Sequence, residues 1–190
     1  MGIIKFIYNK NLKKYFFINK FDYSHFIDLD ENITFIWRNK DKEVNLDSIS
    51  KLKKFCKKNN REFFICNNVK LAIKMRANGV YLSSYNKNLS LNMTNFKKNF
   101  RIIGSAHNYK EIYQKQKQKL DEIFLSPIFK KKNNPKLEIY KYLNLKKMIK
   151  VKDIALGGIN KQNIKRLKLV NSFGFAGIEY FEQKKRPLKY

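Results

Sequence analysis

Short apolar runs alternate with longer polar stretches along most of the chain. The apolar runs lie at residues 15–18, 33–37, 63–66, 79–82, 101–104, 123–125 and 154–156, and a last apolar segment, 173–180, closes the series. Continuous apolar character over three to five residues, without alternation, is typical of parallel strands that are covered on both faces. The pattern therefore predicts eight strands of one parallel sheet.

The stretches between these runs are expected to form helices. In residues 46–58, apolar side chains recur every third position, at Leu46, Ile49, Leu52 and Phe55, which indicates a helix with one buried face. Further helices are expected at 69–75, 109–118, 137–148 and 160–169.

Strands and helices that alternate eight times predict an α/β fold, a closed (β/α)8 TIM barrel. The 190 residues are few for a fold that typically takes about 250. Only residues 19–32 separate the first two strands, so we expect a compact barrel with an abbreviated first βα unit. The alternative is an open doubly wound sheet, which needs a glycine-rich phosphate loop after the first strand. The segment Asn19-Lys20-Phe21-Asp22 is no such loop.

No linker interrupts this pattern, and we expect a single domain over residues 1–190. No apolar run approaches the ~18 residues of a membrane span, and the first nine residues lack the features of a signal peptide. Cys56 and Cys66 have neither the spacing of a metal motif nor the density of a disulfide scaffold. These features predict a cytoplasmic protein without a membrane partner.

Charge adds a second consideration. The chain has 42 Lys and Arg against 15 Asp and Glu, a net charge of +27. Such a charge is compatible with a nucleic-acid partner. The lysines, however, are dispersed over the whole chain, at 51–58, 115–119, 130–132, 146–152 and 161–168. Dispersal favours solvated helix faces over a dedicated nucleic-acid surface, and either arrangement attracts small anionic substrates.

In both architectures the functional site lies at the carboxyl ends of the strands. The residues found there are mostly polar, basic or glycine, with few carboxylates. They include Arg38, Lys40, Asn67, Ser105, His107, Lys131, Lys132, Gly157 and Gly158. Donors and cations around one mouth predict a small anionic ligand, a phosphate or pyrophosphate.

The segment Ile154-Ala155-Leu156-Gly157-Gly158-Ile159-Asn160 ends a strand in two glycines. Glycine lets the backbone approach a phosphate closely and adopt positive φ, and a helix that follows would aim its free N–H groups at the anion. A tight turn without a ligand explains the pair equally well. Asn160 is well placed to cap the next helix.

Taken together, these strand ends resemble the thiamine phosphate synthase/TenI family of (β/α)8 barrels. The ordered matches are Arg38-Asn39-Lys40, Phe64–Val69 with 71–82, Ser105–Asn108, Leu125–Phe129, Ala155–Ile159 with Asn163, and 174–178. Each motif is short, but they follow in family order over about residues 33–182.

The resemblance implies a function in thiamine biosynthesis. It implies condensation of hydroxymethylpyrimidine diphosphate with thiazole phosphate, release of pyrophosphate, and Mg²⁺ without an organic cofactor. Cations would stabilise the diphosphate leaving group while the thiazole nitrogen captures the pyrimidine-methyl cation. By resemblance, Arg38, Lys40 and Asn67 hold the diphosphate, Ser105 contacts the same ligand, and the Gly158 backbone binds the thiazole phosphate.

Several positions depart from the family pattern. The two Mg²⁺-binding aspartates of the family fall at Asn68 and Asn86, which keep an oxygen but lose the charge. The family's T-x-T-K loop falls at 131–134, so that Lys131, Lys132 and Asn134 become the phosphate-binding candidates there. The last phosphate-binding serine falls near Glu182, which we expect beside Gly157 and Gly158 at the neighbouring strand end.

Three functions follow from these residues. The first is a divergent synthase in which lysines partly replace the metal. The second is a TenI-like thiazole tautomerase, with His107 moving protons, or a catalytically silent paralogue. The third is a basic binding protein for nucleic acid on a degenerate barrel, which predicts a steep salt dependence.

Overall fold

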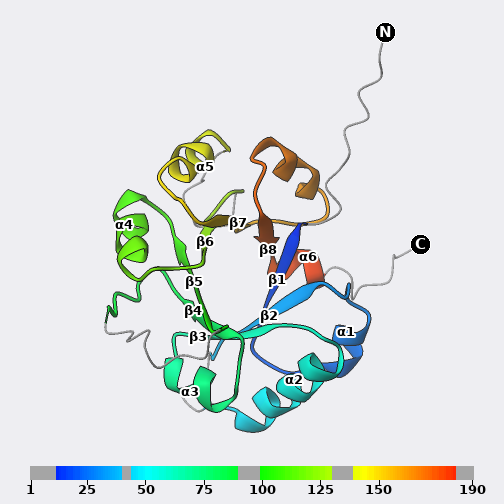
Figure 1. The fold of residues 1–190 in the computed structure, drawn as a ribbon. Coiled ribbons are helices and arrows are strands. Elements are labelled where there is room, and N and C mark those ends of the chain that lie inside the picture. Colours follow the sequence, from blue (N-terminus) through cyan, green and yellow to red (C-terminus); the bar gives the residue numbers. More distant parts are fainter. Residues whose placement is uncertain (1–11, 40–43, 90–98, 130–138, 183–190) are drawn as a thin grey trace, which may run out of the picture.

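Eight parallel strands close a barrel in the computed structural model, which describes residues 12–39, 44–89, 99–129 and 139–182 (Figure 1). The strands are β1 (Lys13–Ile18), β2 (Ile33–Trp37), β3 (Phe63–Cys66), β4 (Gly79–Leu82), β5 (Arg101–Ala106), β6 (Glu122–Leu125), β7 (Lys152–Leu156) and β8 (Gly174–Ala176). Each strand pairs in parallel with its neighbours in sequence, and β8 pairs with β1. The predicted (β/α)8 barrel is therefore confirmed.

Helices cover the outside of the barrel (Figure 1). They are α1 (Tyr23–Ile27), α2 (Leu46–Lys58), α3 (Val69–Lys74), α4 (Tyr109–Lys117), α5 (Ile139–Lys146), the 3-10 helix η2 (Ile164–Leu169) and α6 (Ile178–Glu182). The predicted stripe of α2 is largely buried: Ile49, Leu52 and Phe55 pack inward, while Leu46 remains 45% exposed. Within the described residues, no helix has the length and apolar character that a membrane span requires.

Alternate strand residues form two apolar layers. Tyr15, Phe17 and their counterparts on the other strands fill the barrel, whereas Phe16 packs outward against the helices. Inside the barrel, the Phe17 and Tyr81 rings meet edge to face, with centroids 5.1 Å apart. The interior is thus closed by aromatic packing, which leaves chemistry to the two ends of the barrel.

The first βα unit is abbreviated, as predicted, with five residues in α1. Buried Arg61 holds this segment, since its guanidinium donates to the carbonyls of Phe26 (2.8 Å) and Leu29 (2.9 Å). The same guanidinium lies between the rings of Phe35 and Phe55. One buried arginine thus replaces part of the packing that a longer helix would supply.

An ionic cluster lies at the amino ends of the strands. Glu122 is 2% exposed. It accepts from the Tyr15 hydroxyl, and from Lys13 Nζ at 3.3 Å and Arg101 at 3.2 Å. Burial alone would raise the pKa of Glu62, but Lys13 and Arg101 beside it lower that pKa below its usual value. Because this end faces away from the mouth, the cluster has a stabilising role.

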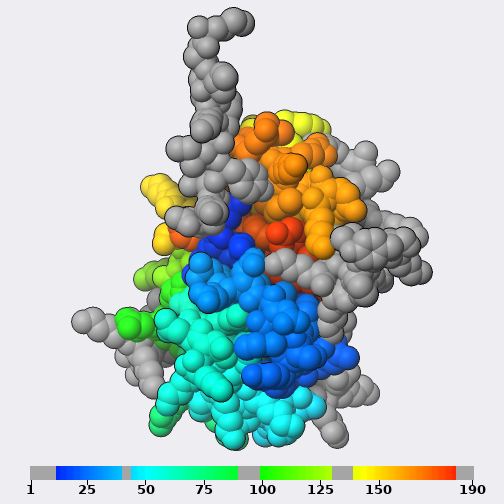
Figure 2. Space-filling view, turned by 90° about the vertical axis from the view of Figure 1, so that its right-hand side faces the viewer, coloured from blue at the N-terminus to red at the C-terminus, as the bar shows by residue number. Residues whose placement is uncertain are grey.

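Two predicted elements differ from the structure. The segment 160–169 begins as a turn and becomes regular only at η2, as a 3-10 helix. The closing segment 173–180 is a strand for three residues only, and α6 follows it. Figure 2 shows one face of the molecule, on which the blue surface of β1 to β2 lies between the cyan surface of later residues and the orange to red surface near the C-terminus.

Candidate functional site

The structure brings several of the predicted site residues to one end of the barrel. Arg38, Asn67 and Gly157 directly follow β2, β3 and β7, and Ser105 is the second-to-last residue of β5. Lys40, Lys131, Lys132 and Asn134 lie outside the described residues.

Arg38 lies over the barrel interior. Its backbone N–H donates to the Ile18 carbonyl at the end of β1 (2.7 Å), and its guanidinium lies 5.1 Å from the ring centroid of Phe17. Its buried Nε–H has no acceptor among the described residues. This cation can therefore bind an anion without giving up an existing hydrogen bond of that group.

Ser105 is 4% exposed and forms a hydrogen bond with Tyr81, a member of the interior layer. Burial raises the pKa of the Tyr81 hydroxyl well above its usual value, and the Ser105 bond and the Arg38 charge offset only part of that rise. Tyr81 consequently stays neutral at physiological pH. Ser105 and Tyr81 therefore place polar but uncharged groups in the barrel interior below the strand ends.

Asn67 connects the ends of β3 and β4. Its φ is +56°, a conformation that asparagine adopts more readily than most residues. Its Oδ1 accepts from the Ser83 N–H (2.9 Å) and from Asn86 Nδ2 (3.2 Å). Its Nδ2 donates to Ser83 Oγ (2.8 Å) and the Tyr85 hydroxyl (2.9 Å). The amide thus has all four hydrogen bonds available to it, so Asn67 positions its neighbours.

Lys115 of α4 binds the backbone of the loop that follows β4. Its ammonium donates to the carbonyls of Ser83 (2.7 Å) and Asn86 (2.9 Å) and to Gln118 Oε1 (2.9 Å). Gln118 Nε2 in turn donates to the carbonyls of Asn86 (3.1 Å) and Asn88 (2.8 Å). Burial lowers the pKa of Lys115 to about 8, so this ammonium is protonated at neutral pH and fixes the loop.

Sequence reasoning missed this lysine, although a signal exists. Lys115 follows buried Ile112 by three positions and is itself 1% exposed, so it lies on the inward stripe of the helix. A lysine on an apolar stripe needs acceptors, and the loop carbonyls supply them.

The candidate metal ligands do not fit Mg²⁺. Asn68 is exposed and caps α3, its Oδ1 accepting from the Leu71 N–H (2.9 Å). Asn86 Oδ1 accepts from the Asn88 N–H (3.0 Å). Mg²⁺ in phosphate sites takes one or two carboxylates. In the part of the chain that the structure describes, no three His, Cys, Asp or Glu side chains gather closely enough to hold a metal ion.

His107 follows β5 at the rim, where its side chain is 43% exposed. Its Nδ1 lies 2.8 Å from Glu111 Oε2, and its backbone N–H donates to the same oxygen (2.7 Å). Asn108 Oδ1 accepts from the Glu111 N–H (3.0 Å) and so caps the N-terminus of α4. The histidine is therefore oriented by a carboxylate and reachable from solvent.

The glycine pair has a packing reason. Gly157 and Gly158 have φ of +98° and +70°. A Cβ on Gly157 would lie 2.8 Å from the Cα of Pro127, and the Gly157 carbonyl accepts from the Phe129 N–H (3.1 Å). The tight turn alone thus accounts for Gly157, and the Gly158 backbone remains a candidate phosphate contact.

The expected helix N-terminus after these glycines is wrong. The side chain of Asn160 does cap, but it accepts from the N–H groups of Gln162 and Asn163 (both 3.1 Å). Asn163 Nδ2 donates back to the Gly158 carbonyl (2.7 Å). This local turn chemistry takes up donors that we expected to face an anion.

The expected place of Glu182 is also wrong, because it ends α6 on the surface and does not lie at a strand end. A cation that the prediction missed contacts the segment that binds Gly157. The Arg166 guanidinium lies 5.1 Å from the ring centroid of Phe129, whose N–H binds Gly157. Arg166 carried no distinctive signal, being one basic residue among many in 161–168.

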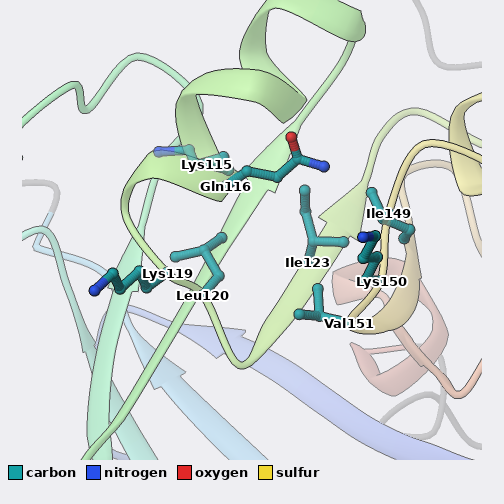
Figure 3. Close-up of a pocket in the computed structure, with 8 residues that line it drawn as sticks. All are labelled: Lys115, Gln116, Lys119, Leu120, Ile123, Ile149, Lys150 and Val151. Atoms are coloured by element: carbon teal, nitrogen blue, oxygen red, sulfur yellow. The ribbon is translucent and has the colours of Figure 1, made fainter.

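A cavity of about 340 Å³ lies away from this mouth, between α4 and residues 149–151 (Figure 3). Leu120, Ile123 and Val151 supply apolar contacts, and Lys119 is among the basic residues that line it. Lys115 contributes its carbon chain, while its ammonium points away from the groove (Figure 3). The groove contains no group of catalytic side chains, so the strand ends remain the candidate site.

Comparison with known proteins gives one consistent result. A family model described as thiamine monophosphate synthase matches residues 29–181. Thiamine-phosphate synthase of Prochlorococcus marinus subsp. pastoris is 33% identical over 128 residues, which is 65% of this chain and 36% of that protein. The chain therefore matches only about a third of that relative's length. Thiamine-phosphate synthase of Flavobacterium psychrophilum is 26% identical over 161 residues, which is 78% of each chain.

Solved structures agree at the level of the fold. Thiamine phosphate pyrophosphorylase from Pyrococcus furiosus superposes with a TM-score of 0.66 and 16% identity, covering 90% of this chain and 91% of that one. The corresponding protein from Bacteroides thetaiotaomicron gives a TM-score of 0.61 and 15% identity, over 94% of this chain and 88% of that one.

Proposed function

Because the chain belongs to the thiamine monophosphate synthase family, we propose that it joins hydroxymethylpyrimidine diphosphate to thiazole phosphate and releases pyrophosphate. The observation that carries the proposal is the Arg38 guanidinium, which lies over the barrel interior at the strand end where a diphosphate would bind and whose buried Nε–H has no acceptor among the described residues. We further propose that the substrates are small phosphorylated anions, that no organic cofactor takes part, and that the reaction takes place in the cytoplasm.

In the proposed reaction, the bond between the pyrimidine methylene carbon and the diphosphate oxygen breaks, and its electron pair leaves with the diphosphate. The thiazole nitrogen then donates its lone pair to that carbon. Arg38 would stabilise the charge that develops on the leaving oxygen, a contribution typically worth about 10²–10³ in rate for one positioned donor. Ser105 and Tyr81 would orient the pyrimidine, and the Gly158 backbone with Arg166 would hold the thiazole phosphate.

The experiment combines purified chain with both substrates and measures thiamine phosphate as its fluorescent oxidation product. Arg38→Met should lower kcat/KM about 100-fold. The exposed lysine Lys74, on α3, provides the control, and Lys74→Met should leave the rate unchanged. Absence of product above background, with an active synthase assayed in parallel, would reject the proposal.

The His107–Glu111 pair favours one second candidate, a thiazole tautomerase. A carboxylate 2.8 Å from Nδ1 would orient the imidazole so that Nε2 moves a proton. This candidate predicts isomerisation of the thiazole carboxylate that His107→Gln abolishes and Tyr109→Phe preserves. Equal turnover by wild type and His107→Gln would exclude it.

A further inference from the structure

The ends of β3 and β4 carry neutral or positive groups where a divalent cation would need negative ones. Asn67, Asn68 and Asn86 are uncharged amides. The charged groups close to them include Arg38, which acts on Tyr81, and Lys115, which donates to the Asn86 carbonyl and feels the charge of Glu111. A dication placed here would meet the positive charges of Arg38 and Lys115, and the Glu111 carboxylate that acts on Lys115 is already bound to His107 and Asn108.

The amide oxygens at this end are already used. Asn68 Oδ1 accepts from the first turn of α3, and Asn86 Oδ1 accepts from the Asn88 N–H. Asn67 Oδ1 accepts two hydrogen bonds, from Ser83 and Asn86. Binding a metal would break a helix cap or the link between the two strand ends.

The backbone carbonyls that a metal could recruit instead are also taken. Those of Ser83, Asn86 and Asn88 accept from the side chains of Lys115 and Gln118. The loop after β4 is therefore fixed with its carbonyls turned toward α4. Reorienting them would remove two of the three acceptors of the buried Lys115 ammonium and leave it only Gln118 Oε1 of the three.

We infer that the ends of β3 and β4 bind no divalent cation, and that protein donors alone meet a diphosphate there. Two donors are available. The Tyr85 hydroxyl accepts from Asn67 Nδ2 (2.9 Å) and is 75% exposed as a residue, so its own hydrogen is oriented away from Asn67. Arg38 contributes its guanidinium, whose buried Nε–H has no acceptor among the described residues. The identity of the anion rests on the proposed function, whereas the exclusion of metal does not.

The first test needs no substrate. Mn²⁺ is titrated into the full chain and free Mn²⁺ is followed by electron paramagnetic resonance. Wild type should show no saturable site up to about 1 mM. The Asn68→Asp/Asn86→Asp protein has both carboxylates and keeps an acceptor for the α3 cap. It should bind Mn²⁺ with a Kd at least about tenfold below that 1 mM limit. Asn45→Asp/Asn144→Asp adds the same charge at the N-cap of α2 and on α5 and should behave as wild type.

The second test uses inorganic pyrophosphate as the probe, with calorimetry in EDTA and in Mg²⁺. Wild-type affinity should agree within about twofold between the two buffers, and Tyr85→Phe should weaken it in both by about tenfold. The Asn68→Asp/Asn86→Asp protein should bind more weakly in EDTA and recover in Mg²⁺.

A saturable wild-type Mn²⁺ site that Asn68→Ala and Asn86→Ala abolish would overturn the inference. So would wild-type pyrophosphate binding that needs Mg²⁺. A double-Asp protein that also fails to bind Mn²⁺ would contradict the argument that the two missing carboxylates keep the cation out. Because neither readout requires product, a chain that lacks synthase activity but passes both tests would refute only the proposed function.

Discussion

Replacing Lys115 by methionine tests whether one buried ammonium fixes the loop after β4. Methionine preserves much of the apolar stem and removes three hydrogen bonds, to Ser83, Asn86 and Gln118. Two of the acceptors keep another donor, since the Ser83 carbonyl also accepts from the Asn86 N–H and the Asn86 carbonyl from Gln118 Nε2. Gln118 Oε1 keeps none among the described residues, so one buried acceptor is left unpaired.

The expected cost follows from these contacts. An unpaired buried acceptor costs about 1–3 kcal/mol, and each of the two further charge-assisted bonds contributes about 1.5–3 kcal/mol. Relief from burying the charge offsets part of this loss. A lysine pKa lowered from 10.5 to about 8 corresponds to about 3 kcal/mol. We therefore expect Lys115→Met to lose about 3 kcal/mol of unfolding free energy at pH 7.

The pH dependence gives an independent check. Between pH 8 and 10.5 the unfolded chain binds the Lys115 proton more tightly than the folded chain does, so this residue makes the folded state more stable as pH rises. The methionine variant lacks this gain. The difference in unfolding free energy between the two proteins should therefore widen by about 1 kcal/mol from pH 7 to pH 9.

Urea denaturation followed by circular dichroism at both pH values measures this difference. Lys110→Met, an exposed lysine in the same helix, should stay within about 0.5 kcal/mol of wild type. A Lys115→Met protein as stable as wild type, or a difference that narrows toward pH 9, would refute the assignment of Lys115 as a buried, loop-fixing cation.

Three further substitutions probe other parts of the barrel by the same urea assay. Gly157→Ala combines positive φ with a Cβ 2.8 Å from Pro127 and should cost about 2–4 kcal/mol. Arg61→Met removes two hydrogen bonds that hold the first βα unit; we expect a loss of about 3 kcal/mol and faster proteolysis of residues 19–32. Tyr142→Phe removes the hydroxyl that donates to buried Asp153 (2.8 Å) and should cost about 1–2 kcal/mol.

Each of these has an outcome that contradicts it. Gly177 has negative or extended φ, and a Cβ there would have its nearest contact at 3.2 Å. Gly177→Ala should therefore lower the free energy of unfolding less than Gly157→Ala does. The reverse order would show that a side chain at Gly157 does not strain its turn. Arg61→Met that unfolds like wild type would remove the arginine from the account of α1. Tyr142→Phe without loss would mean that Lys146, 3.1 Å from Asp153, satisfies that carboxylate by itself.

The strands could be predicted because parallel strands in a barrel are covered on both faces. Their apolar runs need no knowledge of long-range contacts, and their bounds agree with β2, β3 and β4 to the residue. The helix predicted over residues 160–169 is wrong in its first turn, because the side chains of Asn160 and Asn163 bind local backbone groups there in place of a regular helical turn. The strand predicted over residues 173–180 is too long. Apolar residues such as Ile178 and Phe181 can pack against the core from a helix as readily as from a strand, so the apolar pattern does not show where β8 ends.

The candidate site was only partly predictable. Reading the residues after each strand places Arg38 and Asn67 at the mouth, because the fold rule needs only strand order. It does not reveal whether their polar groups are free. The partner of the Asn86 carbonyl, Lys115, lies 29 residues away in the sequence, and such pairings depend on tertiary packing.

The short last strand has a consequence for how the chain reaches its native state. β8 contributes three residues, and the pairs Lys13 with Gly174 and Tyr15 with Ala176 bound its register with β1. Until these residues emerge from the ribosome, β1 and β7 are open sheet edges with unpaired backbone groups, the feature that makes a nascent chain prone to association. The barrel can therefore close at β1 only after β8 has been synthesised. Amides that bridge β1 and β8 are expected to exchange hydrogen sooner than those between β1 and β2, so that the barrel opens along this seam.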